Sequence, residues 1–250
     1  MHSIKTISNN RIKEIVKLHQ KKNRDELGLF IAEGYKILEE LLANKTEIVE
    51  IIALKTAVTK NIDFPISIVD EATMKKISTT DTPCEILCIA KKQTKNINNF
   101  INLNKIALFD SISDPGNLGT IIRSATAFGI EGIILFGNCV DLYSPKVIRS
   151  TTGNFLKLPI IQIKNKDELI QKFSSHKKIA TALSKKNNIS LKECAKIEKF
   201  VVMFGSEAKG LNEELIEIAD KNIRLEMKNN VESLNLSTSA SIIFYELFIN

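Results

Sequence analysis

The second part of this 250-residue sequence alternates short apolar runs with amphipathic stretches, and this alternation limits the possible folds more than any other feature. Strands that alternate with helices form a parallel sheet with helices on both faces. We therefore expect an α/β domain over residues 105–250, of the class that binds ligands at the carboxyl ends of its strands. The expected strands are 105–110, 131–137, 157–163, 178–184, 200–205 and 222–227.

Several helices of this domain have recognisable start signals. Ser144 is followed by a proline, which suits the first helical position after an N-cap. Asn212 is followed by two glutamates, whose negative charge stabilises a helix N-terminus. The last helix is expected from about residue 234 to 248.

Residues 1–95 predict a smaller α/β domain. It combines helical patterns with apolar runs of strand length. The expected helices are 11–22 and 29–45, and the expected strands are 48–54, 64–70 and 85–92. The Asn-rich stretch 96–104 has no strong periodicity, so we expect it to be a linker between the two domains.

The net charge of +6 is concentrated at the N-terminus. The first 24 residues hold seven basic residues and one acidic residue, so the rest of the chain is neutral in sum. Concentrated positive charge favours a polyphosphate partner such as RNA. Lys13, Lys17, Lys21 and Lys22 fall on or beside one expected helix. A lysine-rich surface that is only solvated explains the charge equally well, and both interpretations stay open.

Other features exclude several protein classes. There is no run of 18 apolar residues and no secretory signal pattern at the start, so we expect no membrane span and a cytoplasmic location. The four cysteines do not suggest a disulfide framework. The three histidines, His2, His19 and His176, have no metal-ligand spacing with any cysteine, so no metal is expected.

Three segments carry candidate functional residues, and the first covers 109–130. In this segment an expected strand is followed by an Asp-Pro-Gly turn and then by an expected helix. Gly129 lies just past the end of that helix. Asn117 and Arg123 lie off the apolar stripe of that helix. An isolated arginine is usually a plain surface residue. Here it follows a glycine-containing entry, where a phosphate or a ribose could approach the backbone.

The second segment, 201–211, is an apolar strand followed by Gly205, Glu207 and Gly210. This spacing imitates a phosphate-binding P-loop, but Leu211 stands where that motif requires lysine, so nucleotide hydrolysis is excluded. An ordinary strand-to-helix turn remains an alternative for Gly205.

The third segment, 223–246, places Ser233 and Asn235 at the start of the final helix. Taken alone, both side chains are explained as helix caps. Small residues follow at 237–240, which would allow this helix to pack closely against another element.

Together the three segments resemble the SpoU, or TrmH-type, branch of the SPOUT methyltransferases. The motifs have the order and spacing of that family, and the connecting segment YSPKVIRSTTGNFLKLPI is also typical of it. The segment KKNRDELGLFIAEGYKILEELL resembles the family's N-terminal substrate-binding domain. The motifs are Asn117-Leu118-Gly119 with Arg123, Gly205-Ser206-Glu207 with Gly210-Leu211, and Ser233-Leu234-Asn235-Leu236-Ser237.

The resemblance implies a parallel-sheet SPOUT domain whose C-terminal segment forms a trefoil knot. It also implies a homodimer with cofactor sites beside the subunit interface. S-adenosyl-L-methionine would bind near Gly205, Leu225 and Leu234.

For the reaction, the resemblance implies methylation of a ribose 2′-hydroxyl, with Arg123 as the base. An arginine normally stays protonated, so we expect it to stabilise the developing alkoxide instead. The expected orienting residues are Asn117, Glu207, Ser233 and Asn235. Ribosomal RNA is the expected substrate because the N-terminal domain resembles those of relatives that act on it.

Two alternatives remain at this point: a non-catalytic RNA-binding or ribosome-assembly factor, and the same chemistry on transfer RNA. Three positions also depart from the family pattern. Ala208 and Asn229 replace frequent glycines, and Glu226 replaces a frequent proline. Asparagine tolerates positive φ, so only Glu226 puts the local geometry in doubt.

Overall fold

The computed structural model describes residues 7–57, 62, 64–93, 97–182, 187–229 and 233–249. The chain forms two compact units. The first comprises Met1–Thr94 with Asp141–Leu156, and the second comprises Lys95–Val140 with Lys157–Asn250. Within the described part of the chain, none of the helices combines the length and apolar character that a bilayer crossing requires.

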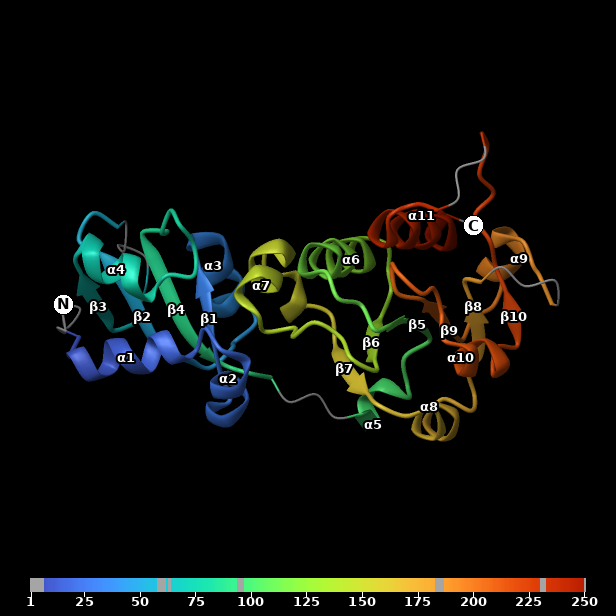
Figure 1. Cartoon of the computed structure of the whole chain (residues 1–250), viewed down its shortest axis with the longest axis horizontal. Coiled ribbons are helices and arrows are strands. Elements are labelled where there is room, and N and C mark those ends of the chain that lie inside the picture. The colour runs from blue at the N-terminus through green and yellow to red at the C-terminus, as the bar shows by residue number, and fades with distance from the viewer. Residues whose placement is uncertain are drawn as a thin grey trace. The chain divides into compact units, whose positions relative to one another are not determined.

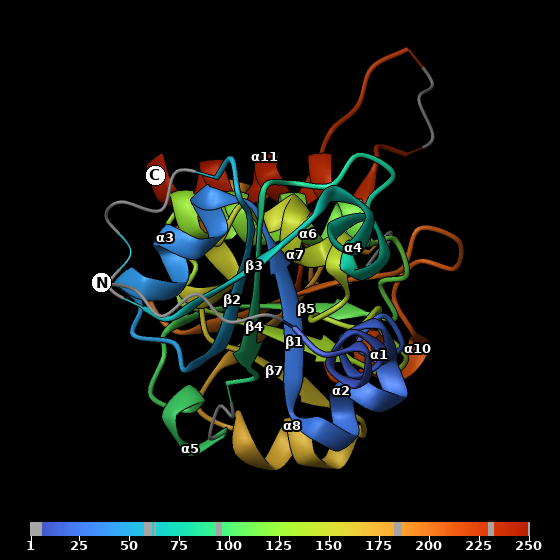
Figure 2. The same cartoon turned by 90° about the vertical axis from the view of Figure 1, so that its left-hand side faces the viewer.

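The first unit is built on a four-stranded mixed sheet in the order β1-β4-β2-β3 (Figure 2). Strand β4 runs antiparallel to both β1 and β2, and β2 runs parallel to β3. The strands are β1 (Leu29–Glu33), β2 (Ile48–Leu54), β3 (Ile66–Val69) and β4 (Ile86–Lys91). The helices are α1 (Asn9–Lys17), α2 (Lys21–Leu27), α3 (Tyr35–Ala43) and α4 (Glu71–Ile77).

The prediction of one helix over 29–45 is wrong in its first part. Leu29–Glu33 is a strand, and only Tyr35–Ala43 is helical. The apolar residues at the start of this stretch are nearly all buried between strand and helix neighbours, which favours extended backbone. Gly34 lies between the two elements with φ of 100°, a conformation that ends the strand and that only glycine adopts without strain.

Residues 141–156 belong to the first unit although the sequence analysis assigned them to the second domain. They contain α7 (Pro145–Thr151) and the short helix η1 (Asn154–Leu156). The buried guanidinium of Arg24 donates to Asp141 Oδ2 from Nη2 at 2.7 Å and from Nε at 3.0 Å. The Tyr143 and Phe155 rings pack against Phe30 at centroid distances of 5.0 and 5.8 Å. These contacts hold the segment against β1 and α2.

The second unit has a six-stranded parallel sheet in the order β10-β8-β9-β5-β6-β7. The helices α6, α9 and α11 lie on one face, and α5, α8 and α10 lie on the other (Figure 1). The strands are β5 (Lys105–Asp110), β6 (Gly132–Phe136), β7 (Ile160–Ile163), β8 (Lys177–Ala180), β9 (Phe200–Phe204) and β10 (Lys221–Asn222). The helices are α5 (Ile97–Phe100), α6 (Pro115–Ala127), α8 (Lys166–Lys172), α9 (Leu191–Ala195), α10 (Glu213–Glu217) and α11 (Leu236–Ile249).

This sheet confirms the expected parallel α/β architecture, with two local differences. The expected strand 222–227 is reduced to a short β10, and the residues after it leave the sheet edge. The expected linker contains α5, and Phe100 is buried in the core of the second unit. The many asparagines of 96–104 suggested a linker, although apolar residues lie between them. The N-caps Ser144 and Asn212 are confirmed, since each side chain accepts a backbone N–H of its helix.

His176 ties two segments of the second unit together. Its side chain is buried, and Nε2 lies 2.7 Å from the Leu103 carbonyl oxygen. Burial lowers the pKa of His176, and the nearby Lys199 and Lys178 lower it further. The folded protein therefore favours the neutral imidazole.

We predict a stability loss at acidic pH that depends on His176. The unfolded chain binds a proton near pH 6.5, where the folded chain resists it. The contribution of His176 to stability is therefore present above about pH 6.5 and is lost as the pH falls through the lower folded pKa. In urea unfolding between about pH 7.5 and 5.5, the midpoint of the wild type should fall more steeply than that of His176→Gln. Equal slopes would contradict this role.

Candidate active site

The carboxyl edge of the parallel sheet brings together segments that are far apart in the sequence. At this edge β5 ends at Asp110, and α6 begins a few residues later. Asp114 is the N-cap of α6, and its Oδ1 accepts the backbone N–H of Asn117 at 2.7 Å. This cap fixes the first turn of α6, and with it the backbone position from which the Asn117 side chain extends.

The amide of Asn117 bridges the other two predicted motifs. Its Nδ2 donates to Glu207 Oε1 at 2.7 Å, and its Oδ1 accepts from Asn235 Nδ2 at 3.0 Å. Glu207 lies in the loop after β9, and Asn235 directly precedes α11. The Asn117–Glu207–Asn235 chain therefore joins one residue from each of the three sequence motifs.

Asn235 is also the helix cap that the sequence suggested. Its Oδ1 accepts from the backbone N–H of Ser237 at 2.8 Å and from the Ser237 hydroxyl at 2.6 Å. These two bonds leave only the Asn235 amide nitrogen to face Asn117. The cap and the site are therefore two roles of one side chain. Ser233 lies at the pocket described next and donates no hydrogen bond to α11 among the described residues.

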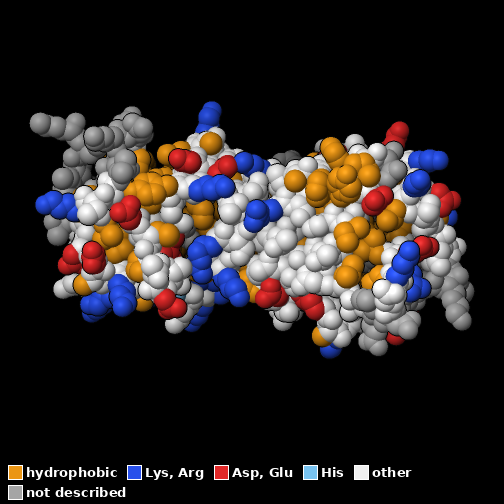
Figure 3. All heavy atoms as spheres, turned by 90° about the horizontal axis from the view of Figure 1, so that it is seen from above, with side chains coloured by type: hydrophobic (Ala, Val, Ile, Leu, Met, Phe, Trp, Pro, Cys, Tyr) orange, Lys and Arg blue, Asp and Glu red, His pale blue; other side chains and the backbone are white. Residues whose placement is uncertain are grey.

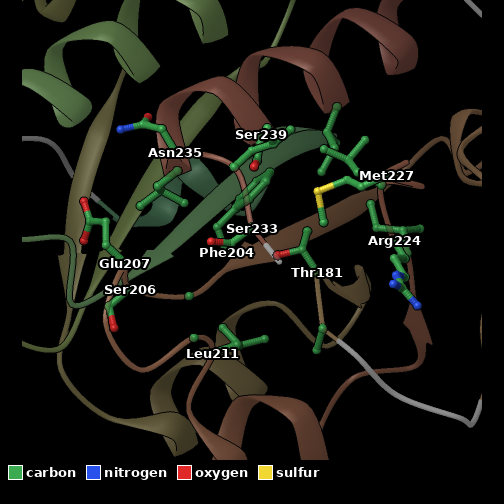
Figure 4. A pocket seen from close by; sticks show the side chains of 18 residues that line it. Thr181, Phe204, Ser206, Glu207, Leu211, Arg224, Met227, Ser233, Asn235 and Ser239 are labelled. Atoms are coloured by element: carbon green, nitrogen blue, oxygen red, sulfur yellow. The ribbon is translucent and has the colours of Figure 1, made fainter. Parts of the chain in front are cut away.

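A pocket of about 530 Å³ opens beside this chain of hydrogen bonds (Figure 4). The residues that line it come from four stretches of the chain: 181–182, 204–207 with 210–211, 223–225 with 227, and 233–236 with 239 and 243. All three residues expected to bind the cofactor line it, as do three of the expected catalytic residues. These lining residues are Gly205, Leu225, Leu234, Glu207, Ser233 and Asn235. The volume falls within the range usual for small-molecule sites.

The two remaining predicted residues do not line the pocket. Asn117 contacts it through its hydrogen bonds to Glu207 and Asn235. Arg123 is exposed on α6, six residues beyond Asn117, and its side chain makes no hydrogen bond or ion pair with any described residue.

Gly205 forms the tightest part of the pocket wall. A Cβ at this position would overlap the backbone of Gly210 and Leu211. The turn between them is closed by two hydrogen bonds of 3.0 Å, from Ser206 N to Gly210 O and from Gly210 N to Ser206 O. Only glycine allows the end of β9 to touch the returning chain this closely.

The three departures from the family pattern lie outside the pocket lining. Asn229 has φ of 59°, a conformation that asparagine tolerates where glycine is frequent. Glu226 and Ala208 are exposed, and neither is part of the pocket lining.

Several lining residues were missed by the sequence analysis. Thr181 and Ala182 line the pocket because β8 ends at Ala180 rather than at Ser184. Met227 and Ser239 also line it. The rule that ligands bind just beyond the carboxyl ends of parallel strands would have pointed to Thr181. In the described part of the chain, no three His, Cys, Asp or Glu side chains gather as metal ligands.

Comparison with known families gives two matches that divide the chain. The SpoU rRNA Methylase family matches residues 104–245, and the MRM3-like substrate binding domain matches residues 9–88. The chain belongs to the SpoU rRNA methylase family.

Individual SpoU relatives resemble the chain along its whole length. A Bacillus subtilis protein, 23S rRNA (guanosine(2553)-2′-O)-methyltransferase RlmP, is 28% identical over 99% of each chain. An uncharacterized tRNA/rRNA methyltransferase of Synechocystis is 30% identical over 98% of this chain and 92% of its own. The crystal structure of an AdoMet-bound rRNA methyltransferase from Sinorhizobium meliloti matches with a TM-score of 0.86 at 28% identity. That match covers 98% of this chain and 97% of the other.

These findings confirm four predictions made from the sequence: the SpoU family, the parallel α/β fold, RNA ribose methyltransferase as the enzyme class, and S-adenosylmethionine as the cofactor. The pocket fits such a cofactor on its own evidence. Its wall at Gly205 has no room for a side chain, and Phe204, Leu211 and Ile243 provide apolar contacts.

We predict that Gly205→Ala abolishes S-adenosylmethionine binding. The new methyl group would push apart the backbone that closes the pocket wall. Calorimetric titration of the full chain measures the effect. Ala208→Ser in the same turn is the control, because Ala208 is exposed and lies outside the lining. Unchanged affinity in Gly205→Ala would rule out this pocket as the cofactor site.

Proposed function

We propose that this chain methylates a ribose 2′-hydroxyl of ribosomal RNA, with the cofactor held in the pocket beside Gly205, Leu225 and Leu234. The observation that carries the proposal is the Asn117–Glu207–Asn235 chain at the pocket edge. Ribosomal RNA as the substrate is supported by the names of the relatives from B. subtilis and S. meliloti. Such an enzyme would act in the cytoplasm.

S-adenosylmethionine supplies an already activated methyl group, so the protein has to orient the hydroxyl and stabilise the charge that develops on it. Glu207 and Asn235 line the pocket, and their hydrogen bonds to Asn117 set the orientation of their polar ends at its edge. We assign to them, together with Ser233, the positioning of the ribose. Arg123 has no acidic partner among the described residues, so its guanidinium is free to contact the alkoxide and an adjacent phosphate.

We also propose the trefoil knot that the SPOUT resemblance implies. Its support is the match of residues 104–245 to the SpoU rRNA methylase family and the TM-score of 0.86 to the S. meliloti rRNA methyltransferase structure.

The first experiment is methyl transfer by Arg123→Ala. We expect at least ~10²-fold less transfer from labelled cofactor to bulk ribosomal RNA, the scale for removing one charge-stabilising group. The unfolding midpoint should stay unchanged, because Arg123 is exposed and its helix buries the opposite face. Near-normal turnover would overturn the assigned role. A wild-type chain that transfers no methyl group to any RNA would favour the non-catalytic alternative.

A homodimer is supported by an apolar surface on α11. Figure 3 shows hydrophobic side chains gathered on this face of the second unit. Tyr245 is 47% exposed and Phe248 is 60% exposed, and both rings contact Phe128, the C-cap residue of α6. Exposed apolar patches of this kind mark interfaces. A second copy is the occupant that the SPOUT resemblance implies. The patch lies at the C-terminal ends of α6 and α11, the two helices whose N-terminal ends hold Asn117 and follow Asn235.

We predict that Tyr245→Asp with Phe248→Asp converts a dimer into a monomer. Sedimentation of the wild type should give about twice the 28.0-kDa mass of one chain. The control is Leu27→Asp, which places the same charge at an exposed apolar residue of the first unit and should leave the dimer intact. A monomeric wild type would contradict the proposal.

We propose that the first unit binds RNA through the outer side of α1 and α4. These helices pack over the same core, and His19 Nε2 lies 3.0 Å from the Ile77 carbonyl oxygen. Their exposed lysines have no ion pair with any described residue, unlike Lys21, which pairs with Asp25. The unpaired lysines are Lys13, Lys17, Lys75 and Lys76.

A matched pair of triple variants tests this surface. Lys13, Lys17 and Lys75 are changed to Gln in one variant, and Lys36, Lys45 and Lys55 in the other. The first should weaken RNA binding and lower the salt slope by roughly one unit per lost phosphate contact. The second removes the same charge from other exposed positions of the unit and should have little effect. Unchanged RNA affinity and salt slope in both variants would show that the lysines only solvate the surface. Equal losses in the two variants would show that RNA binding is not confined to α1 and α4.

A further inference from the structure

Asp110 is a buried acid that stands next to the pocket without lining it. It is the last residue of β5, and only 6% of its surface is exposed. A buried carboxylate is costly unless both of its oxygens have partners. Asp110 has them. Oδ1 accepts from the Ser111 hydroxyl at 2.9 Å, and Oδ2 accepts from the backbone N–H of Asn212 at 3.0 Å.

The bond to Asn212 reaches the end of the pocket turn. Gly210 and Leu211 line the pocket and contact Gly205, and Asn212 follows them directly. Asn212 is also the N-cap of α10, accepting from Glu214 N at 3.1 Å. The turn 206–210 is therefore closed by its own backbone bonds, while its exit is held by Asp110 from another strand.

The other side of Asp110 is equally constrained. Ser111 adopts φ of 53°, a left-handed conformation that is unfavourable for serine. Its backbone N–H donates to Phe136 O at 2.9 Å, and its hydroxyl donates to Asp110. The carboxylate therefore connects the chain leaving β5 to the chain leaving the pocket turn.

We propose that Asp110 is a positioning residue for S-adenosylmethionine. By holding Asn212, it keeps Gly210 and Leu211 at the distance from Gly205 that gives the pocket wall its shape. This inference rests on the proposed assignment of that pocket to the cofactor. Asp110 itself touches neither cofactor nor RNA, and its effect passes through the backbone of the turn.

The experiment compares Asp110→Ala with Asp110→Asn by calorimetric titration of the full chain with S-adenosylmethionine. The alanine variant loses the acceptor for Asn212 N, and we expect at least ~10-fold weaker binding, the scale of one hydrogen bond to a charged acceptor. The asparagine variant keeps a carbonyl oxygen for Asn212 N, and its amide N–H can donate to the Ser111 hydroxyl. Its affinity should stay within about 3-fold of the wild type, a difference of under 1 kcal/mol.

Two controls separate positioning from general stability. Phe100→Leu trims a buried ring that packs against Gly132 at the amino end of β6, whereas the pocket lies at the carboxyl edge of the sheet, so it should lower the unfolding midpoint but leave cofactor affinity unchanged. RNA affinity should be unchanged in both Asp110 variants. If Asp110→Ala does not fold, Asp110→Ser replaces it, since a serine hydroxyl is too short to keep the contact with Asn212.

Each outcome decides the matter. Weak binding by the alanine variant with rescue by asparagine supports the inference. Wild-type affinity in Asp110→Ala, alongside loss of binding in Gly205→Ala, overturns the role of Asp110 and leaves the pocket assignment standing. If Gly205→Ala also keeps its affinity for S-adenosylmethionine, both the role of Asp110 and the assignment of the pocket to the cofactor are wrong. Equal losses of cofactor affinity in Asp110→Ala and Phe100→Leu would show that only the stability of the unit is involved.

Discussion

The Asn117 amide is the contact on which the geometry of the candidate site depends. Only one orientation of that amide lets nitrogen donate to Glu207 and oxygen accept from Asn235. Its partners lie 90 and 118 residues away in the chain, and Asn235 is held by its own cap of α11. The bridge therefore orients a carboxylate and an amide at the pocket edge, where pre-set polar groups act on a developing charge without reorganising.

The parallel sheet makes this bridge possible because it places the ends of β5 and β9 at one edge. The stacked rings of Phe109 and Phe204, 4.9 Å apart, hold these neighbouring strands together just below the site. The chain that follows each of these two strands has little conformational freedom. Gly205 leaves no room for a side chain, and the carboxylate of Asp110 accepts the backbone N–H that follows the turn. Precise packing of backbone against backbone thus shapes the pocket.

The sequence predicted the elements that depend on local pattern and the residues that belong to compact motifs. The strand after Lys105, the caps Ser144 and Asn212, and the loop at Gly205 follow from residue type and spacing. Contacts between distant segments could not be predicted this way. The packing of 141–156 with the first unit depends on a buried pair between Arg24 and Asp141, which no periodicity reveals. The role of Asp110 depends on a backbone partner 102 residues later.

The identity of the methylated atom tests the central claim most directly. The full chain is incubated with isotope-labelled S-adenosylmethionine and unmodified 23S ribosomal RNA, and the RNA is digested to nucleosides for mass spectrometry. The account predicts that the label appears in one 2′-O-methylated nucleoside, with the added methyl group on the ribose fragment, because Asn117 fixes Glu207 and Asn235 at the pocket edge, where we assign to them the positioning of the ribose. Label on a base, or no label in RNA while the cofactor still binds, would contradict it.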